Sequence, residues 1–285
     1  MNSVNNIELT TAQDVFFDFC LWEYQPIPPF IDKYRSINLL YNSFDIAGVD
    51  QSIYDVCQAI RKGIGTDKTV WGVKLVDGKL CWELYFYDYK RLQRELSINR
   101  LNEILRPFMA CDLEYSEDRP YFMFSIDLAE KLAPLEKIEI YVGNIGCTVS
   151  SGVSYALTKD DLVFDNLYYF FDAKKEMEQI KGKIASSAYL DLCGLDMASI
   201  LWSELSDCKC IVVANKRYSD GIYYSGITIE QLTLFLRRLE YPQQIIDYVE
   251  SNKSKLDHMF YDVGVDYRME AGQVKILKSS YYGIF

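Results

Sequence analysis

Charged and aromatic side chains alternate with apolar ones in the segment 69–89, which reads TVWGVKLVDGKLCWELYFYDY. Successive side chains of a β-strand point to opposite faces, so the two sets must lie on different sides of a sheet. The first strand directs Lys74 to the polar side, and the second directs Glu83, Tyr85 and Tyr87 there. Such a surface is suited to an aromatic or hydrophobic compound that carries an anionic head.

The same alternation places further charged and aromatic side chains on the polar side of later strands. The segment KIEIYV directs Lys137, Glu139 and Tyr141 there, because its aliphatic residues occupy the other side. The segment LVFDNLYYFF adds Asn166 and Tyr168. We therefore expect these side chains to share one surface with the polar residues of the first hairpin.

Two other segments, CKCIVVANKR and QVKILKSSYY, mix polar and apolar residues on both faces, so alternation leaves their orientation open. For the polar side we favour Asn215 and Arg217 in the first segment and Lys275 and Tyr281 in the second. The alternatives are Lys216 and Lys278.

A water-facing sheet is the simplest alternative to a lined cavity. Tyrosine is a common strand residue, and alternating Lys and Glu mark the solvated face of an open sheet. However, the chain has 23 tyrosines, many of them on strands beside aromatic or small neighbours. A salt-bridged, water-facing sheet would not need so many, and we therefore favour a cavity.

Composition and charge exclude several classes of protein. With 49% hydrophobic and 25% charged residues, the chain of 285 residues can form a sizeable core. A net charge of −11 argues against a nucleic-acid binder or a basic membrane-surface protein, which need clustered Lys and Arg. No apolar run approaches the ~20 residues of a membrane span, and the N-terminus lacks a signal pattern. We expect a cytoplasmic protein whose eight cysteines are reduced.

Metal-binding and nucleophile motifs are sparse. His258 is the only histidine, so a site built from several imidazoles is impossible, and a lone histidine among apolar residues usually packs. The glycines at 63–65 form neither a dinucleotide fingerprint nor a Walker motif. The acidic pair at 160–161 has no second pair to complete the magnesium clamp of many diphosphate-cleaving enzymes. We expect no metal site, and a magnesium-dependent terpene synthase is disfavoured.

Two hydrophobic periods separate strands from helices. A period of two, bounded by turn residues such as the Asp-Gly pair at 77–78, predicts five antiparallel hairpins. Apolar residues at helical spacing predict helices before most of them. Strands are predicted near 69–76, 80–89, 120–128, 137–144, 150–158, 162–173, 208–217, 221–226, 259–269 and 273–285. Helices are predicted within 7–22, 52–65, 89–108, 174–189, 196–205, 228–239 and 241–252.

This order favours a single α+β domain spanning 1–285, with about ten antiparallel strands in five hairpins and helices on one side of the sheet. If the sheet closes, it becomes a closed or nearly closed barrel surrounded by helices. Its polar side then lines a lumen wide enough for a ligand.

The order of elements resembles that of the ABBA-type, or PT-barrel, aromatic prenyltransferases, whose barrel consists of five helix-helix-strand-strand units around a lumen. The resemblance covers the chain from about Ser52 to Phe285. Local similarity to the cyanobactin prenyltransferase branch lies in VKLVDGKL, FSIDLAEKLAPLEKIEIYV and VKILKSSYYGIF. One departure is that the sequence has no room for a helical pair between KIEIYVGN and SSGVSYALT.

The resemblance implies roles for the residues on the polar side. In that family lysines and arginines hold the diphosphate of an allylic donor, and tyrosines shield the allyl cation. An electron-rich indole or phenol then attacks this cation. Diphosphate binding is thereby implied for Lys74, Lys137, Arg217 and Lys275, and shielding for Tyr85, Tyr141, Tyr168 and Tyr281. Glu83 is the implied proton acceptor, and a salt bridge from Glu83 to Lys74 is the alternative.

The function implied by the resemblance is metal-independent prenyl transfer, as in secondary metabolism. The donor is an allylic diphosphate, and the acceptor is an aromatic small molecule or a peptide side chain. The reaction would need no cofactor and no magnesium, and neither nucleic acid nor a membrane would be a partner. The alternative is a non-catalytic ligand-binding or protein-assembly module built on a large antiparallel sheet.

Overall fold

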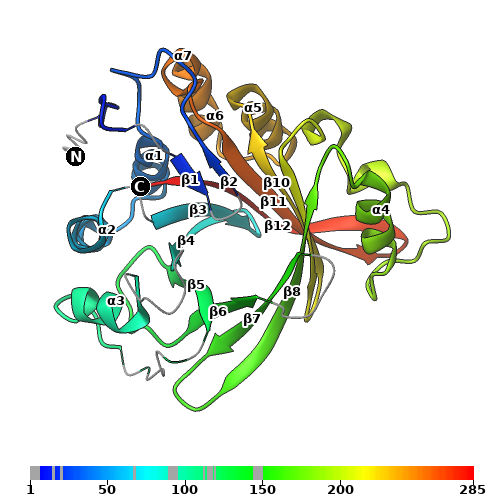
Figure 1. Ribbon diagram of the computed structural model, residues 1–285, viewed down its shortest axis with the longest axis horizontal. Coiled ribbons are helices and arrows are strands. Elements are labelled where there is room, and N and C mark those ends of the chain that lie inside the picture. The colour runs from blue at the N-terminus through cyan, green and yellow to red at the C-terminus, as the bar shows by residue number, and fades with distance from the viewer. Residues whose placement is uncertain are drawn as a thin grey trace.

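Ten antiparallel strands close into a barrel in the computed structural model (Figure 1). The structure describes residues 7–14, 17–19, 22–66, 69–88, 96–111, 113, 118, 120–143 and 150–285, with only the backbone described at 17–19 and 22–23. Each strand pairs with the next along the chain, and the last pairs with the first. The barrel strands are β3 (Thr69–Val76), β4 (Lys79–Tyr87), β5 (Tyr121–Leu128), β6 (Ile138–Gly143), β7 (Ser151–Leu157), β8 (Leu162–Asp172), β9 (Cys210–Lys216), β10 (Asp220–Ile227), β11 (Tyr261–Glu270) and β12 (Gln273–Ile284).

Closure confirms the predicted α+β barrel. A closed sheet has no unpaired edge, so the backbone groups of every barrel strand can pair on both sides. The Asp-Gly turn between β3 and β4 is also confirmed. Asp77 and Gly78 both have positive φ angles, 48° and 75°, as a two-residue turn between twisted strands requires.

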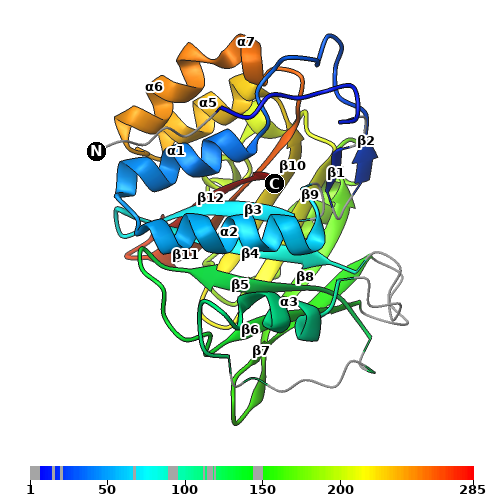
Figure 2. The same cartoon turned by 90° about the vertical axis from the view of Figure 1, so that its left-hand side faces the viewer.

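Helices cover the outside of the barrel (Figures 1 and 2). They contact it through the apolar face of the strands, where Trp82 of β4 is fully buried. The Trp82 indole donates a hydrogen bond to the Ser43 hydroxyl at 2.9 Å, and its ring packs edge-on against Phe44 at 5.1 Å between centroids. The described helices are α1 (Ile37–Ala47), α2 (Gln51–Ile64), α3 (Ile98–Leu105), α4 (Met177–Ala185), α5 (Ile229–Arg238), α6 (Gln243–Ser251) and α7 (Lys253–Leu256). None of the helices in the described part of the chain is long and apolar enough to cross a membrane.

Local rules predicted some of these helices and missed others. The predicted helix within 228–239 is present as α5. A capping box begins it, because the Thr228 hydroxyl accepts from the Gln231 backbone and the Gln231 side chain accepts from the Thr228 backbone. The helix α1 was not predicted. Its N-cap residue Ser36 makes no capping bond within the helix, and its hydroxyl instead bonds the backbone of Ile284 in β12.

Two predicted helices are wrong. Within 7–22, the described residues form β1 (Phe17–Phe19), which pairs with β2 (Trp22–Tyr24), and a bridge from Leu9 to Tyr34. The segment 196–205 forms two short 3₁₀ turns, Met197–Ser199 and Ser203–Leu205, instead of one helix. The first half of the predicted helix 89–108 lies outside the described residues, and its second half contains α3.

Candidate functional site

The barrel strands alternate between the helices and the lumen as the sequence predicted. On β4, Leu84 and Phe86 have no exposed surface and pack under the helices. Glu83 and Tyr85, at the alternate positions, line cavities inside the barrel. The pleat of a single strand therefore supplies both the core of the protein and the wall of its lumen.

Four tyrosines from four strands form a layer across the lumen. This tyrosine layer consists of Tyr85, Tyr141, Tyr168 and Tyr223, which line two cavities inside the barrel. The ring centroids of Tyr85 and Tyr141 are 6.5 Å apart, and those of Tyr141 and Tyr168 are 5.8 Å apart. Burial raises the pKa of each of these phenols, which therefore stay neutral. The layer separates a charged chamber from an apolar chamber.

Inward-facing glycines make room for the tyrosine rings. A Cβ atom on Gly264 of β11 would lie 2.1 Å from the Tyr223 ring, and one on Gly72 of β3 would lie 2.7 Å from the Tyr282 ring. Only hydrogen at these positions allows each ring to lie against the barrel wall. The Tyr282 ring also contacts Tyr85 at 5.8 Å between centroids, on the apolar side of the layer.

The charged chamber has a volume of about 220 Å³. Its first cluster surrounds Lys74, whose ammonium pairs with the carboxylates of Glu83 and Asp127, the latter at 2.9 Å. Glu83 also accepts hydrogen bonds from the Tyr85 hydroxyl at 2.7 Å and from the Ser125 hydroxyl at 2.5 Å. Burial disfavours the charged form of Lys74, but the two carboxylates outweigh this effect and raise its pKa.

A second cluster surrounds Asp266 of β11. Its carboxylate pairs with the ammonium groups of Lys216 at 2.7 Å and Lys278 at 2.8 Å. Lys216 also donates to the Tyr223 hydroxyl at 2.7 Å, and this hydroxyl donates to Asp266 at 3.0 Å. Burial acts to raise the pKa of Asp266, but the two lysines outweigh it and hold that pKa well below its usual range.

The charges of this chamber balance. Five cations and five carboxylates line it, and Lys137 pairs with Glu139 at 3.1 Å. Arg217 is the one cation of this lining that forms no ion pair with a described carboxylate, and its guanidinium lies over the Tyr218 ring at 5.3 Å. Tyr218 is 67% exposed, so the chamber opens to solvent here. The charged lining residues are Lys74, Glu83, Asp127, Lys137, Glu139, Asp165, Lys216, Arg217, Asp266 and Lys278.

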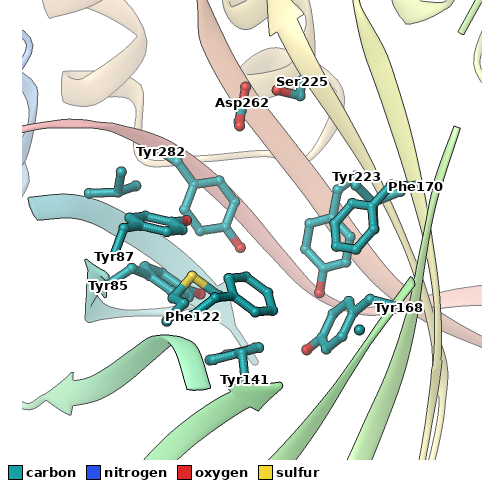
Figure 3. A pocket seen from close by; sticks show the side chains of 14 residues that line it. Tyr85, Tyr87, Phe122, Tyr141, Tyr168, Phe170, Tyr223, Ser225, Asp262 and Tyr282 are labelled. Carbon is teal, nitrogen blue, oxygen red and sulfur yellow. The ribbon is translucent and has the colours of Figure 1, made fainter. Parts of the chain in front are cut away.

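The apolar chamber lies on the other side of the tyrosine layer and has a volume of about 120 Å³. Aromatic and aliphatic side chains dominate its lining, and Asp262 and Ser225 lie together at one end of it (Figure 3). The Asp262 carboxylate accepts from the Gly226 backbone at 3.0 Å and from the Ser225 hydroxyl. Burial raises the pKa of Asp262 from 3.8 to about 6. The other residues that line the apolar chamber include Val70, Tyr87, Phe122, Met123, Gly152, Phe170, Val212 and Tyr282.

Comparisons with known proteins give similarity in structure only. No protein-family model matches the chain, and no curated protein matches it in sequence. One similar structure is 6-dimethylallyltryptophan synthase from Micromonospora olivasterospora in complex with DMASPP and Trp. It has 8% identity and a TM-score of 0.48, and the alignment covers 86% of this chain and 95% of that one. Another is the prenyltransferase PriB in its apo form, with 7% identity, a TM-score of 0.46 and coverage of 87% and 95%.

Most of the predicted site residues line the lumen. Lys74, Lys137, Arg217, Glu83, Tyr85, Tyr141 and Tyr168 all line the charged chamber, and Tyr87 lines the apolar one. The salt bridge between Glu83 and Lys74, which the sequence left as an alternative, is present. The chemical roles of these residues stay predictions.

The predicted placement of Lys275 and Tyr281 in the lumen is wrong. The side chain of Lys275 is 58% exposed and pairs with Glu270 at 2.8 Å. Tyr281 is fully buried outside the lumen, where its ring meets Tyr241 at 5.5 Å. The register of β12 against β11 shifts by one residue at Leu277, which reverses the alternation along β12. The alternatives Lys216 and Lys278 line the charged chamber instead.

Sequence reasoning missed Tyr223 and the acidic residues of β11. Tyr223 is followed by a second tyrosine, so alternation cannot tell which of the two faces the lumen. In β11, however, Asp262, Gly264 and Asp266 alternate with apolar residues, and this pattern predicts an inward polar row. No group of three or more potential metal-ligating side chains occurs among the described residues.

Proposed function

We propose that the protein transfers a prenyl group from an allylic diphosphate to an electron-rich aromatic acceptor without a metal ion. One observation carries this proposal: a layer of tyrosines crosses a closed barrel between a chamber with lysines and an apolar chamber. Departure of diphosphate from an allylic carbon produces an anion and a delocalised cation. The two products need opposite environments, which the two sides of such a layer provide.

The charged chamber suits the diphosphate in this proposal. Ammonium and guanidinium groups stabilise phosphate oxygens by charge-assisted hydrogen bonds. Arg217, at the open end and without an ion pair to a described carboxylate, would meet the anion first. Lys74 and Lys137 would then exchange part of their contact with carboxylates for contact with phosphate oxygens.

The tyrosine layer suits the allylic cation. Neutral aromatic rings attract a cation through the negative potential of their faces, and their burial excludes water that would quench it. Glu83 lies beside the layer, hydrogen-bonded to Tyr85, and its carboxylate would take the proton that the acceptor loses. The phenols themselves stay neutral because burial raises their pKa values.

The test is calorimetric titration with dimethylallyl diphosphate, followed by product analysis with indole and phenol, in EDTA and in magnesium. We expect binding, and product in both conditions. Lys74→Ala should weaken diphosphate binding by about tenfold or more, because it removes a buried cation of the chamber. Lys275→Ala is the matched control and should leave binding unchanged, because Lys275 lies outside the lumen. Absence of binding, or an equal effect of the two substitutions, would refute the proposal.

A specific observation favours a second candidate function. The five cations and five carboxylates of the charged chamber compensate one another before any ligand enters. Such a lining accommodates a neutral or zwitterionic ligand with less rearrangement than a diphosphate. The second candidate is therefore a non-catalytic ligand-binding or assembly module. Binding of a zwitterionic amino acid such as tryptophan, together with no heat from dimethylallyl diphosphate, would favour it.

A further inference from the structure

Asp262 is the one carboxylate among the described residues that line the apolar chamber, and no lysine or arginine is among them. Asp262 lies in the inward row of β11, four residues before Asp266, and its carboxylate accepts hydrogen bonds from the Gly226 backbone and the Ser225 hydroxyl. The two hydrogen bonds fix the carboxylate at one end of the chamber, where Figure 3 shows Tyr282 and Tyr223 between it and the pair Tyr141 and Tyr168. Its accessible surface faces the chamber that it lines.

Two carboxylates of the charged chamber show what Asp262 lacks. Asp266 is paired with two lysines and Glu83 with one. Among the residues that the structure describes, no lysine, arginine or histidine forms an ion pair with Asp262. A buried carboxylate without a counter-ion is expensive to ionise, and a cation supplied by a ligand would compensate it.

The walls of the chamber also suit a cation that is attached to an aromatic ring. Tyr87, Phe170, Tyr223 and Tyr282 present aromatic rings around the space next to Asp262 (Figure 3). Aromatic faces attract ammonium groups, most strongly where water is excluded. The volume of about 120 Å³ is comparable to the roughly 150 Å³ of an apolar cavity that accommodates benzene. The chamber therefore has room for about one small aromatic ring.

We propose that the apolar chamber binds a small aromatic amine whose protonated nitrogen pairs with Asp262. An anionic ligand is disfavoured here, because the nearest charge is a carboxylate. A neutral aromatic compound would fill the space but leave Asp262 without a counter-charge. The identification of this amine as the prenyl acceptor rests on the proposed function, whereas its binding in the chamber does not.

The test is calorimetric titration of the whole protein with two probes of equal size, benzylamine and benzyl alcohol, near neutral pH and without diphosphate. We expect benzylamine to bind at least about tenfold more tightly than benzyl alcohol, because only the amine brings the missing charge. Asp262→Asn should reduce this preference to about twofold or less, since the amide keeps the shape but not the charge. Circular dichroism confirms that this nearly isosteric variant is folded.

Asp165→Asn is the matched control, because Asp165 is a carboxylate of the charged chamber, on the other side of the tyrosine layer. It should leave the preference for benzylamine unchanged. The proposal is overturned if neither probe binds, if both bind equally, or if the preference survives Asp262→Asn. It is also overturned if Asp165→Asn removes the preference, which would place the amine in the charged chamber. Because no donor is present, failure of prenyl transfer and failure of amine binding are separate results.

Discussion

Replacing Asp262 by asparagine should stabilise the protein at neutral pH. The pKa of this carboxyl rises from 3.8 to about 6 because folding removes it from water. A tenfold change in a proton-binding constant equals about 1.4 kcal/mol, so ionised Asp262 costs about 3 kcal/mol of folding free energy. Asparagine can still accept from Gly226 and Ser225. We expect the free energy of unfolding to increase by up to about 3 kcal/mol in Asp262→Asn.

The size of this effect depends on pH in a defined way. Because the folded pKa is the higher one, the penalty is absent at low pH and develops as pH rises from about 4 to about 6. The titratable neighbours Tyr24, Cys208 and Cys210 have pKa values raised by burial and stay neutral across this window. The stabilisation by Asp262→Asn should therefore be full at about pH 8 and shrink below about 1 kcal/mol near pH 4.

Asp266→Asn provides a control of opposite sign on the same strand. Asp266 compensates Lys216 and Lys278, so its neutralisation leaves two lysines without their carboxylate and should cost about 3–5 kcal/mol at neutral pH. The assay for both variants is urea unfolding followed by tryptophan fluorescence, at about pH 8 and about pH 4. The reasoning fails if Asp262→Asn is no more stable than the wild type at the higher pH. It also fails if the gain is the same at both pH values.

Two further predictions concern the tyrosine layer and the charged chamber. Gly264→Ala should cost about 1–3 kcal/mol in urea unfolding, because its new methyl group overlaps a Tyr223 ring that hydrogen bonds hold in place. The control is Gly182→Ala in α4, where the new methyl group has open space and should not destabilise the protein. An equal loss of stability in the two variants would contradict the packing argument. Lys74→Ala should lower the free energy of unfolding by about 3–5 kcal/mol, because it leaves Glu83 buried without its cation. The double change Lys74→Met with Glu83→Gln should recover most of this loss, because it removes both charges. A loss below about 1 kcal/mol in Lys74→Ala would show that the pair contributes little.

The alternation rule predicted the site well where strands are regular. The hairpin of β3 and β4 has paired positions throughout, so the apolar set and the polar set of the sequence each stay on one side. This regularity is why Lys74, Glu83 and Tyr85 were placed correctly from the sequence alone. The closure of the barrel could not be predicted in the same way, because it depends on pairing between β12 and β3, at opposite ends of the sequence.

Irregular strands account for the errors in the site. On β12 the extra residue at Leu277 reverses the alternation, and nothing in QVKILKSSYY marks where that reversal occurs. On β5, Phe122 and Met123 both line the apolar chamber because the register shifts between Tyr121 and Met123. A bulge is set by the pairing of two strands, so the sequence of one strand does not reveal it.

The inward row of β11 explains how a continuous barrel wall supports two different chambers. Asp266, at one end of the row, shares the charged chamber with two lysines, while Asp262, at the other end, faces aromatic rings. Gly264 lies between them, and its missing side chain admits the Tyr223 ring that separates the two spaces. Two carboxylates four residues apart on one face of the same strand would otherwise experience similar surroundings. Their opposite pKa shifts therefore arise from the tyrosine between them, which keeps the lysines on one side and leaves the other carboxylate to a ligand.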